Sequence, residues 1–294
     1  VETLRALVDR AGSLSEVGNV ELPHDLRVGE IRRTLAARIR KLPAEELPFF
    51  ASAAVAGRQL DAEFLSALHP GLDVPALAQQ GVEAAVLEHE GKGWRFSHDK
   101  IREFLIADLD DEERARIHGN IASALEAQRA DGAPPQWALL AHHFGMAGNA
   151  DKEGIYAGHA GVELVYTAPV RAIQLIERSL ELVQEPGDEG VPRLFLRRML
   201  AEAYFGIEDS AASRVELERF CESTGAKLPT STWGWVVTLV SELLRQRRQL
   251  KKPAPVSASK EETHNARELS LALDRLALIL FFSKLRTLTI TLMA

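Results

Sequence analysis

Apolar residues recur at helical spacing along most of this chain and alternate with polar residues in only one short region. The helical pattern predicts helices at 29–42, 44–57, 61–69, 74–82, 99–109 and 110–128. Between the fourth and fifth of these, residues 85–90 and 94–98 predict two strands joined by a turn at 91–93. Short helices followed by a β-hairpin indicate a winged-helix domain over residues 29–130.

The first 28 residues have a different character. Leu4, Leu7 and Val8 lie at helical spacing, and a stretch rich in Gly, Ser, Asn and Pro follows them. We expect residues 1–28 to be the end of a preceding helical region and a linker. Since the chain begins at Val1 and stops at Ala294 without a polar tail, we also expect a piece of a longer protein.

Beyond Pro135 the pattern predicts helices in succession and no strand. Their expected ranges are 137–148, 151–166, 169–184, 191–206, 209–223, 231–249 and 263–282. Small and large residues recur at matching places in two helix pairs, as in a degenerate tetratricopeptide repeat. The matching positions are Tyr156, Ala160, Ala172, Ile176 and Ser179 in the first pair and Ala201, Tyr204, Ser213, Leu217 and Phe220 in the second.

The predicted fold class is therefore mostly α, with a winged-helix domain followed by a tetratricopeptide-like α-solenoid over residues 133–294. Residues 185–190 are expected to form a loop that lengthens the repeat. A Lys-, Pro- and Ser-containing stretch predicts a break near 251–261.

Composition and charge exclude several classes of protein. Of 294 residues, 46% are apolar, which indicates a globular chain, and the formal net charge of −7 disfavours nonspecific binding to nucleic acid. Cys221 is the single cysteine, so no internal disulfide can form, and its helical context favours a buried structural thiol. No targeting segment or sufficiently long apolar run is present, so we expect a cytoplasmic protein without a membrane partner.

The sequence contains none of the common catalytic motifs. A phosphate loop, a nucleophile elbow and paired Cys-x-x-Cys motifs are all absent. His142 and His143 are adjacent, and neighbouring residues on a helix point about 100° apart, which favours packing over metal binding. We therefore expect this chain by itself to be no enzyme and to hold no metal or cofactor.

DNA binding is the activity that a winged helix first suggests. The third and fourth predicted helices carry Asp61, Glu63, Asp73 and Glu83, which disfavour contact with phosphates. The basic residues between Arg245 and Lys252 indicate a solvated helix end that could also touch an acidic partner.

The junction between the second strand and the next helix is the strongest candidate site. His98 and Asp99 stand where the helix begins, and a carboxylate such as that of Asp99 can accept free backbone N–H groups there. Such a helix N-terminus can also bind an anion such as a phosphate. The alternative is that His98 merely ties down the junction.

Four stretches of the sequence resemble bacterial STAND-type signal-transduction ATPases, which join an AAA-like nucleotide-binding core to a winged helix and a tetratricopeptide-like arm. They are 33–43, 53–61, 96–99 and 140–144. Residues 200–204 and 275–288 resemble the cyclase-associated members most. Related cores are fused to nucleotide cyclases, Ser/Thr kinases or LuxR/MalT-type transcription factors.

The resemblance implies a role for the His98-Asp99 pair. In STAND proteins the winged helix ends in a Met-His-Asp-type motif whose His contacts the phosphates of bound ADP, and Phe96-Ser97-His98-Asp99 stands in the matching place. The resemblance also implies that the core that binds ATP or ADP with Mg lies before Val1. This chain therefore departs from the family by lacking the phosphate loop.

We expect a regulatory part of a STAND ATPase: the winged helix acts as a nucleotide-state lid, and the arm senses a protein or small-ligand inducer. Its other partners would be its own nucleotide-binding core and an effector domain. The two alternatives are a helical-repeat scaffold for protein–protein interaction with no nucleotide role, and a winged-helix DNA-binding regulator.

Overall fold

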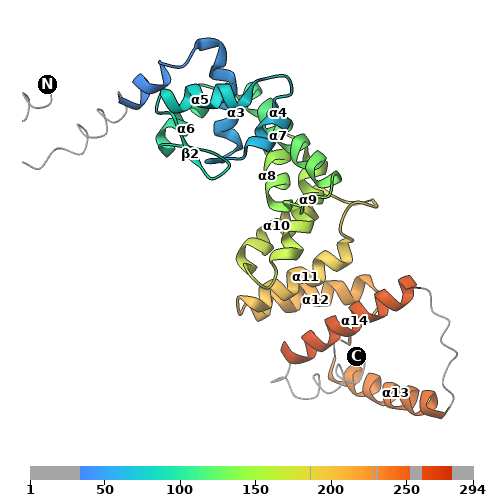
Figure 1. The fold of residues 1–294 in the computed structure, drawn as a ribbon. Helices are drawn as coiled ribbons and strands as arrows, with labels where there is room; N and C mark the ends of the chain where they lie inside the picture. The colour runs from blue at the N-terminus through green and yellow to red at the C-terminus, as the bar shows by residue number, and fades with distance from the viewer. Residues whose placement is uncertain (1–33, 186, 227, 230, 252–259, 280–294) are drawn as a thin grey trace, which may run out of the picture. The chain divides into compact units, whose positions relative to one another are not determined.

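The computed structural model describes residues 34–279 except 186, 227, 230 and 252–259 (Figure 1). Contacts divide the chain into two compact units, Val1–Ala124 (unit 1) and Leu125–Ala294 (unit 2). The segment expected at 1–28 and most of the expected break at 251–261 lie outside the described residues. The predicted domain boundaries therefore stay predictions.

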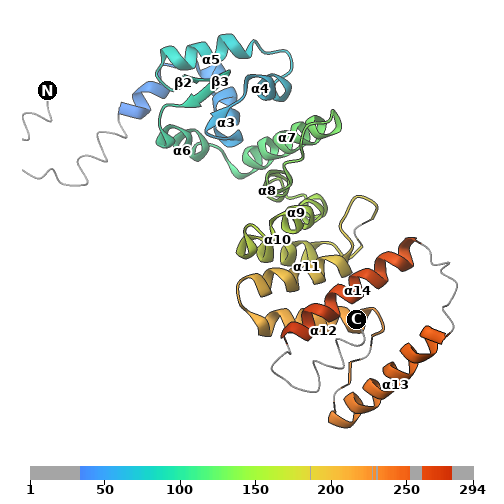
Figure 2. The same cartoon turned by 60° about the horizontal axis from the view of Figure 1, so that its bottom comes forward.

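Unit 1 consists of short helices and a small sheet (Figure 2). Residues 34–39 are helical, as predicted. The remaining elements are the 3-10 helix η2 (Ala44–Glu46), α3 (Leu47–Ala56), β1 (Gln59–Leu60), α4 (Ala62–Leu68), α5 (Val74–Glu83), β2 (Leu87–Glu90), β3 (Gly93–Phe96), α6 (Asp99–Ala107) and the first part of α7 (Asp111–Ala130). The predicted hairpin is confirmed, whereas strand β1 was not predicted, because two residues give no periodicity.

The sheet has the order β1-β3-β2, with both pairs antiparallel. The central strand β3 begins at Gly93, where a Cβ atom would lie 2.1 Å from the carbonyl oxygen of Leu60, so no larger residue fits. The inner face of the sheet and the helices bury one apolar core, whose largest fully buried side chains are Phe50, Phe96, Leu65, Leu87 and Ile101.

Two aspartates fix the helix starts in this unit. Asp61 accepts a hydrogen bond from the backbone N–H of Phe64 at 2.8 Å, which confirms its predicted capping role. Asp73 accepts one from Ala76 at 3.1 Å and starts α5 in the same way. An N-cap of this kind stabilises a helix by about 1 kcal/mol.

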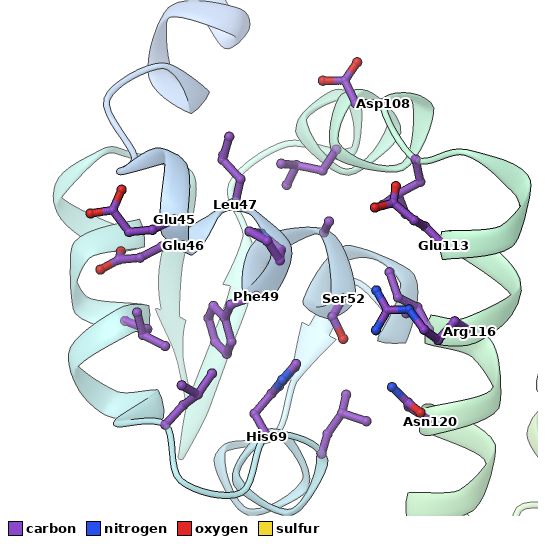
Figure 3. Close-up of a pocket in the computed structure, with 18 of the residues that line it drawn as sticks. Glu45, Glu46, Leu47, Phe49, Ser52, His69, Asp108, Glu113, Arg116 and Asn120 are labelled. Carbon is purple, nitrogen blue, oxygen red and sulfur yellow. The ribbon is translucent and has the colours of Figure 1, made fainter.

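Unit 1 also contains a pocket of about 530 Å³ (Figure 3). Its walls come from η2 and α3, from the end of α4, and from the region where α6 ends and α7 begins. Some of the residues in its walls, such as Phe49 and Leu105, also belong to the apolar core of the unit.

Unit 2 contains helices that pack on their neighbours in chain order. They are α8 (Trp137–Met146), α9 (Ala150–Leu164), α10 (Pro169–Leu182), α11 (Arg193–Gly206), α12 (Ser210–Ser223), α13 (Thr232–Lys251) and α14 (Lys260–Ile279). Contacts run from each of α8 to α11 to the next helix, and α14 packs on α12 and α11 (Figure 2). Every predicted helix of this region is present with small differences at the ends, and the end expected for the last helix, 280–282, lies outside the described residues.

Nine of the ten positions that suggested a repeat are buried, and Tyr204 is partly buried. Ala160, Ala172, Ala201, Ser213 and Leu217 are all at most 1% exposed. The Ser213 hydroxyl donates to the carbonyl of Ala201 at 2.8 Å, which joins α12 to α11. Small side chains thus stand where neighbouring helices approach closely, as expected of helical repeats.

Glycines in α9 bring the next helix even closer. Cβ atoms added at Gly154, Gly158 and Gly161 would lie 2.4 to 2.8 Å from side chains of α10 and the residue after it. The spacing of these glycines, i, i+4 and i+7, places them on one face of α9. This stripe of glycines therefore allows α9 and α10 to approach closely.

Two buried ion pairs hold α14 against α11. Arg198 donates to Glu268, and the Arg275 guanidinium donates to both carboxylate oxygens of Glu202, at 3.0 and 2.6 Å. All but Arg275 are at most 8% exposed. Because removing one partner would leave a buried charge without compensation, these pairs fix the register of α14 on α11.

Among the described helices, none has the length and apolar character that a bilayer-spanning helix requires.

We predict that Gly161→Ala destabilises unit 2 and that Gly206→Ala does not. The added methyl at 161 would lie 2.5 Å from Ile176 Cγ1. Overpacking costs about 1–3 kcal/mol and outweighs the roughly 1 kcal/mol gain in helix propensity. At Gly206 the nearest atom is Pro169 Cβ at an ordinary 3.5 Å, so that variant keeps only the gain.

Urea denaturation followed by circular dichroism would measure the free energy of unfolding of both variants. Equal stabilities would show that α10 can move away from α9 without loss, and the stripe would then not determine the packing.

Candidate functional site

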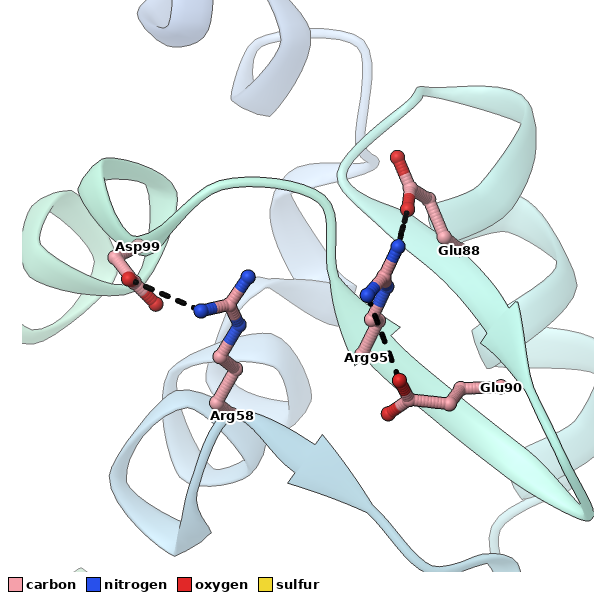
Figure 4. Close-up of polar contacts among 5 residues, drawn as sticks. All are labelled: Arg58, Glu88, Glu90, Arg95 and Asp99. Carbon is pink, nitrogen blue, oxygen red and sulfur yellow. Dashed lines mark hydrogen bonds and ion pairs between the residues drawn. The ribbon is translucent and has the colours of Figure 1, made fainter.

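The junction between β3 and α6 is capped by His98 and not by Asp99. His98 has the extended backbone of an N-cap, and its Nδ1 accepts a hydrogen bond from the backbone N–H of Lys100 at 3.1 Å. Asp99 is the first helical residue, and its carboxylate contacts the Arg58 guanidinium at 3.4 Å (Figure 4). The expectation that Asp99 caps the helix was therefore wrong, because the imidazole of His98 accepts the hydrogen bond from the free N–H instead.

Backbone and side-chain bonds hold the junction on both sides of His98. The N–H of Phe96 donates to the carbonyl of Arg58 at 3.1 Å, and Ser97 donates through both its N–H and its hydroxyl to residues 86 and 85. On the helix side, the Arg102 guanidinium donates twice to the carbonyl of Ala54, at 3.0 and 3.1 Å. Phe96 and Ile101 are fully buried, so the exposed His98 between them has a fixed position.

The cap determines where His98 carries its proton. Because Nδ1 accepts a hydrogen bond, the neutral imidazole must carry its hydrogen on Nε2. Within the part of the chain that the structure describes, no hydrogen bond or ion pair involves Nε2. The capping role and a ligand-binding role of His98 are thus compatible, since they use different nitrogen atoms.

Arg58 is the residue that the sequence reasoning missed at this site. It lies in the turn between α3 and β1, and its side chain and that of Asp99 are about half exposed, at 51% and 55%. An ion pair so open to solvent is worth at most about 1 kcal/mol, so an incoming anion can compete with Asp99 for the guanidinium. No sequence signal joins the two residues, because 41 positions separate them.

In the hairpin beside the junction, Arg95 forms ion pairs with two glutamates of the same hairpin. Arg95 lies directly opposite Glu88 in the β2–β3 register and contacts it at 3.0 Å, and a second guanidinium nitrogen contacts Glu90 at 3.5 Å (Figure 4). A cross-strand pair of opposite charges is favourable, and with Lys92 the two carboxylates and two cations of the hairpin leave it without a net charge. Arg95 is therefore poorly placed to bind a phosphate.

The other candidate residues of the sequence belong to unit 2. His143 is buried in unit 2, while the neighbouring His142 is exposed and its ring lies edge-on at 5.2 Å. Among the described residues, no group of His, Cys, Asp or Glu side chains is arranged to hold a metal ion. Cys221 is fully buried, and burial, with smaller contributions from Glu218 and Glu222, raises the pKa of its thiol to about 11.

An aromatic cluster in unit 2 also went unpredicted. Trp137 stacks on His159 with centroids 4.5 Å apart, and Tyr156 stacks on both Trp137 and Phe144. Arg129 lies 5.3 Å over the Trp137 ring, and Tyr156 donates its hydroxyl to Glu126. Burial and the Glu126 carboxylate raise the pKa of Tyr156, so the phenol keeps its proton. The ring contacts make the cluster a packing element that joins the end of α7 to α8 and α9.

Comparison with known proteins gives one structural match. No protein family and no curated protein matches the sequence. Among solved structures, a Signal Transduction ATPase with Numerous Domains (STAND) protein with a tetratricopeptide repeat sensor, from Pyrococcus horikoshii, matches with a TM-score of 0.36 and 13% identity. The alignment covers 90% of this chain and 44% of that protein, so this chain spans less than half of that protein's length. A likeness at this level assigns no residue and no function here.

We predict that His98→Ala loosens the first turn of α6 and that His98→Asn does not. Alanine removes the acceptor for the Lys100 N–H, which costs about 1 kcal/mol, whereas asparagine is a favoured N-cap. Amide hydrogen exchange of α6 would report the difference. Unchanged exchange in the alanine variant would mean that the imidazole contributes nothing to the cap.

We also predict that Cys221 is inert in the folded protein. With a pKa of about 11, roughly one thiol in a thousand is ionised at pH 8, and burial blocks access as well. Modification by an aromatic disulfide reagent should be at least about 100-fold slower than in urea-unfolded protein. Equal rates before and after unfolding would contradict the buried position.

Proposed function

We propose that this chain is the regulatory part of a STAND signal-transduction ATPase. In this proposal unit 1 is a winged helix that acts as a nucleotide-state lid, and unit 2 is a sensor arm. The parent protein would supply the core that binds ATP or ADP with Mg, and an effector such as a nucleotide cyclase, kinase or transcription factor. This chain itself would perform no catalysis.

The element order of unit 1 supports the winged-helix assignment. A helix, a short strand, two helices and a hairpin follow one another, and the hairpin strand β3 returns between β1 and β2. In this arrangement the hairpin β2–β3 would be the wing, and α6 follows its second strand in the chain.

The observation that carries the lid proposal is the hydrogen bonding of the two ring nitrogens of His98. Its Nδ1 is occupied by the helix cap, so the neutral ring offers one N–H donor, Nε2, at the exposed start of α6. A phosphate oxygen is an acceptor for such a donor, and the N-terminus of α6 favours negative charge. The Arg58 guanidinium becomes a second donor near His98 when its ion pair with Asp99 breaks. A site that contacts phosphates can bind ADP and ATP with different affinity, as a switch requires.

The arm assignment rests on the packing of unit 2. Consecutive helices stack on one another through small residues, which is how repeat arrays build extended binding surfaces. Protein or small-ligand inducers would bind there.

DNA binding is the weaker alternative. Between Gln59 and Gly91 the sequence contains neither Lys nor Arg, so α4 and α5 carry no cation that could neutralise a phosphate. The carboxylates of Asp61 and Asp73 are engaged as helix caps, and Arg95 is paired within the hairpin. A plain helical-repeat scaffold without a nucleotide role remains the second alternative, since unit 2 has its own buried cores.

We predict that His98→Ala and His98→Asn both accelerate release of ADP from the full-length protein, by about five- to tenfold. Either substitution removes the Nε2–H donor, and one hydrogen bond of about 1 kcal/mol corresponds to that factor. The asparagine variant keeps the cap, so it separates nucleotide contact from helix stability.

Release of bound ADP after rapid dilution into excess ATP would measure the effect. Acceleration by alanine alone would indicate a purely structural role of His98. No acceleration in either variant would overturn the lid proposal and favour the scaffold alternative, for which partner binding by residues 133–294 alone should equal that of the whole chain.

A further inference from the structure

The pocket of unit 1 has the size of a small-molecule site. Its volume of about 530 Å³ falls in the range of ligand pockets in proteins, and no part of the His98 junction lines it. A ligand in this pocket would therefore contact none of the residues on which the proposed function depends.

The walls of the pocket are largely apolar. Large aliphatic and aromatic side chains surround it on several sides: Ile39, Leu47, Phe49, Leu68, Leu77, Leu105, Leu109 and Ile117. Some of these also belong to the core of the unit, so their positions are fixed by packing. A ligand that fills this space must have an apolar body.

Polar groups converge on one part of the pocket. Ser52 of α3, His69 at the end of α4, and Arg116 and Asn120 of α7 point toward the same space (Figure 3). Arg116 and Asn120 are four residues apart and share a face of α7. All four side chains can donate a hydrogen bond.

Two of these donors lack an acceptor. The Nε2 atom of His69 is buried and has no hydrogen-bond partner, and burial lowers the pKa of this imidazole, which keeps it neutral near pH 7. No ion pair or hydrogen bond engages the Arg116 guanidinium within the described part of the chain. Arg116 is exposed to solvent, whereas for the buried Nε2 of His69 the lack of a partner is unfavourable, so an acceptor placed at His69 Nε2 would be stabilised. Arg116 can contribute its charge to binding such an acceptor.

The carboxylates of the pocket limit the charge of that acceptor. Glu45 and Glu46 lie across the pocket from Arg116, and Asp108 points away from it (Figure 3). Glu113 precedes Arg116 by one helical turn without forming an ion pair with it. Four carboxylates, among them Glu46 with a buried Oε2 that has no hydrogen-bond partner, outnumber the one guanidinium. They repel anions, and because the repulsion grows with charge, a doubly charged phosphate is disfavoured more than a singly charged group held at Arg116.

We propose that this pocket binds an amphipathic monocarboxylate, with its apolar chain against Leu47, Phe49 and Ile117 and its carboxylate at Arg116. Ser52, His69 and Asn120 supply the remaining hydrogen bonds to the carboxylate. The ligand class is a medium-chain fatty acid or a small molecule of the same chemistry.

Calorimetric titration of the whole chain with decanoate, decanol and decyltrimethylammonium, each below its micelle concentration, tests the proposal. Decanoate should bind saturably and at least tenfold more tightly than the other two. Octanoate should bind about 15-fold more weakly than decanoate, because each buried methylene contributes about a factor of four.

The variant Arg116→Gln tests the position of the head group. It should weaken decanoate at least tenfold and leave decanol unchanged, because only a charge-assisted hydrogen bond is lost. Arg40→Gln removes another exposed arginine of unit 1 that does not line the pocket, and should change nothing.

Amide chemical shifts of the decanoate complex should change at α3 and at residues 108–120. Tighter binding of decyltrimethylammonium, equal affinity of decanoate in the Arg116→Gln protein, or absence of saturable binding by decanoate would each overturn the proposal. Because His98 is not involved, these outcomes leave the nucleotide experiment unaffected.

Discussion

The central strand β3 is the constraint on which unit 1 depends. It pairs with β1 on one edge and β2 on the other, and this pairing requires the backbone of Gly93 to approach Leu60 more closely than any side chain would permit. Trp94 and Phe96 then project into the core, while Arg95 faces outward between two glutamates. The strand ends at Phe96, two residues before His98, so the sheet also determines where the imidazole lies.

That junction illustrates how one side chain can have a structural and a chemical role together. An N-cap is usually a short polar side chain, and an imidazole in this position uses only one of its two nitrogens. The cap fixes the ring, and the ring then presents its other nitrogen in a defined direction. A ligand contact made by Nε2 would therefore require little loss of side-chain entropy on binding.

Unit 2 depends on close packing of backbone against side chains. The glycines of α9 let α10 approach, and Ala201 and Ser213 do the same for α11 and α12. Between α11 and α14, a bidentate ion pair and a buried ion pair add to an apolar contact that includes Ala201. Such pairs contribute more to the specificity of packing than to its free energy, because their desolvation offsets much of the attraction.

The two candidate sites in unit 1 differ in the surroundings of their arginines. The hairpin neutralises its arginine internally, whereas Arg58 and Arg116 remain accessible to anions in two different places. The first lies beside a helix N-terminus in solvent, which suits a hydrated phosphate. The second lies against apolar walls, which suits a carboxylate that carries a hydrocarbon chain.

The sequence by itself determined the helices, the hairpin and the buried positions of the arm, because periodicity and small-residue spacing are local properties of the chain. Asp61 could be assigned as a cap since its partner lies three residues away. Strand β1 and the contact of Arg58 with Asp99 needed the tertiary structure, because they join residues more than 30 positions apart. The cap itself was decided by side-chain reach, which let His98 and not Asp99 meet the Lys100 N–H. The pocket was likewise invisible in the sequence, since α3, α4 and α7 form it only when folding brings them together.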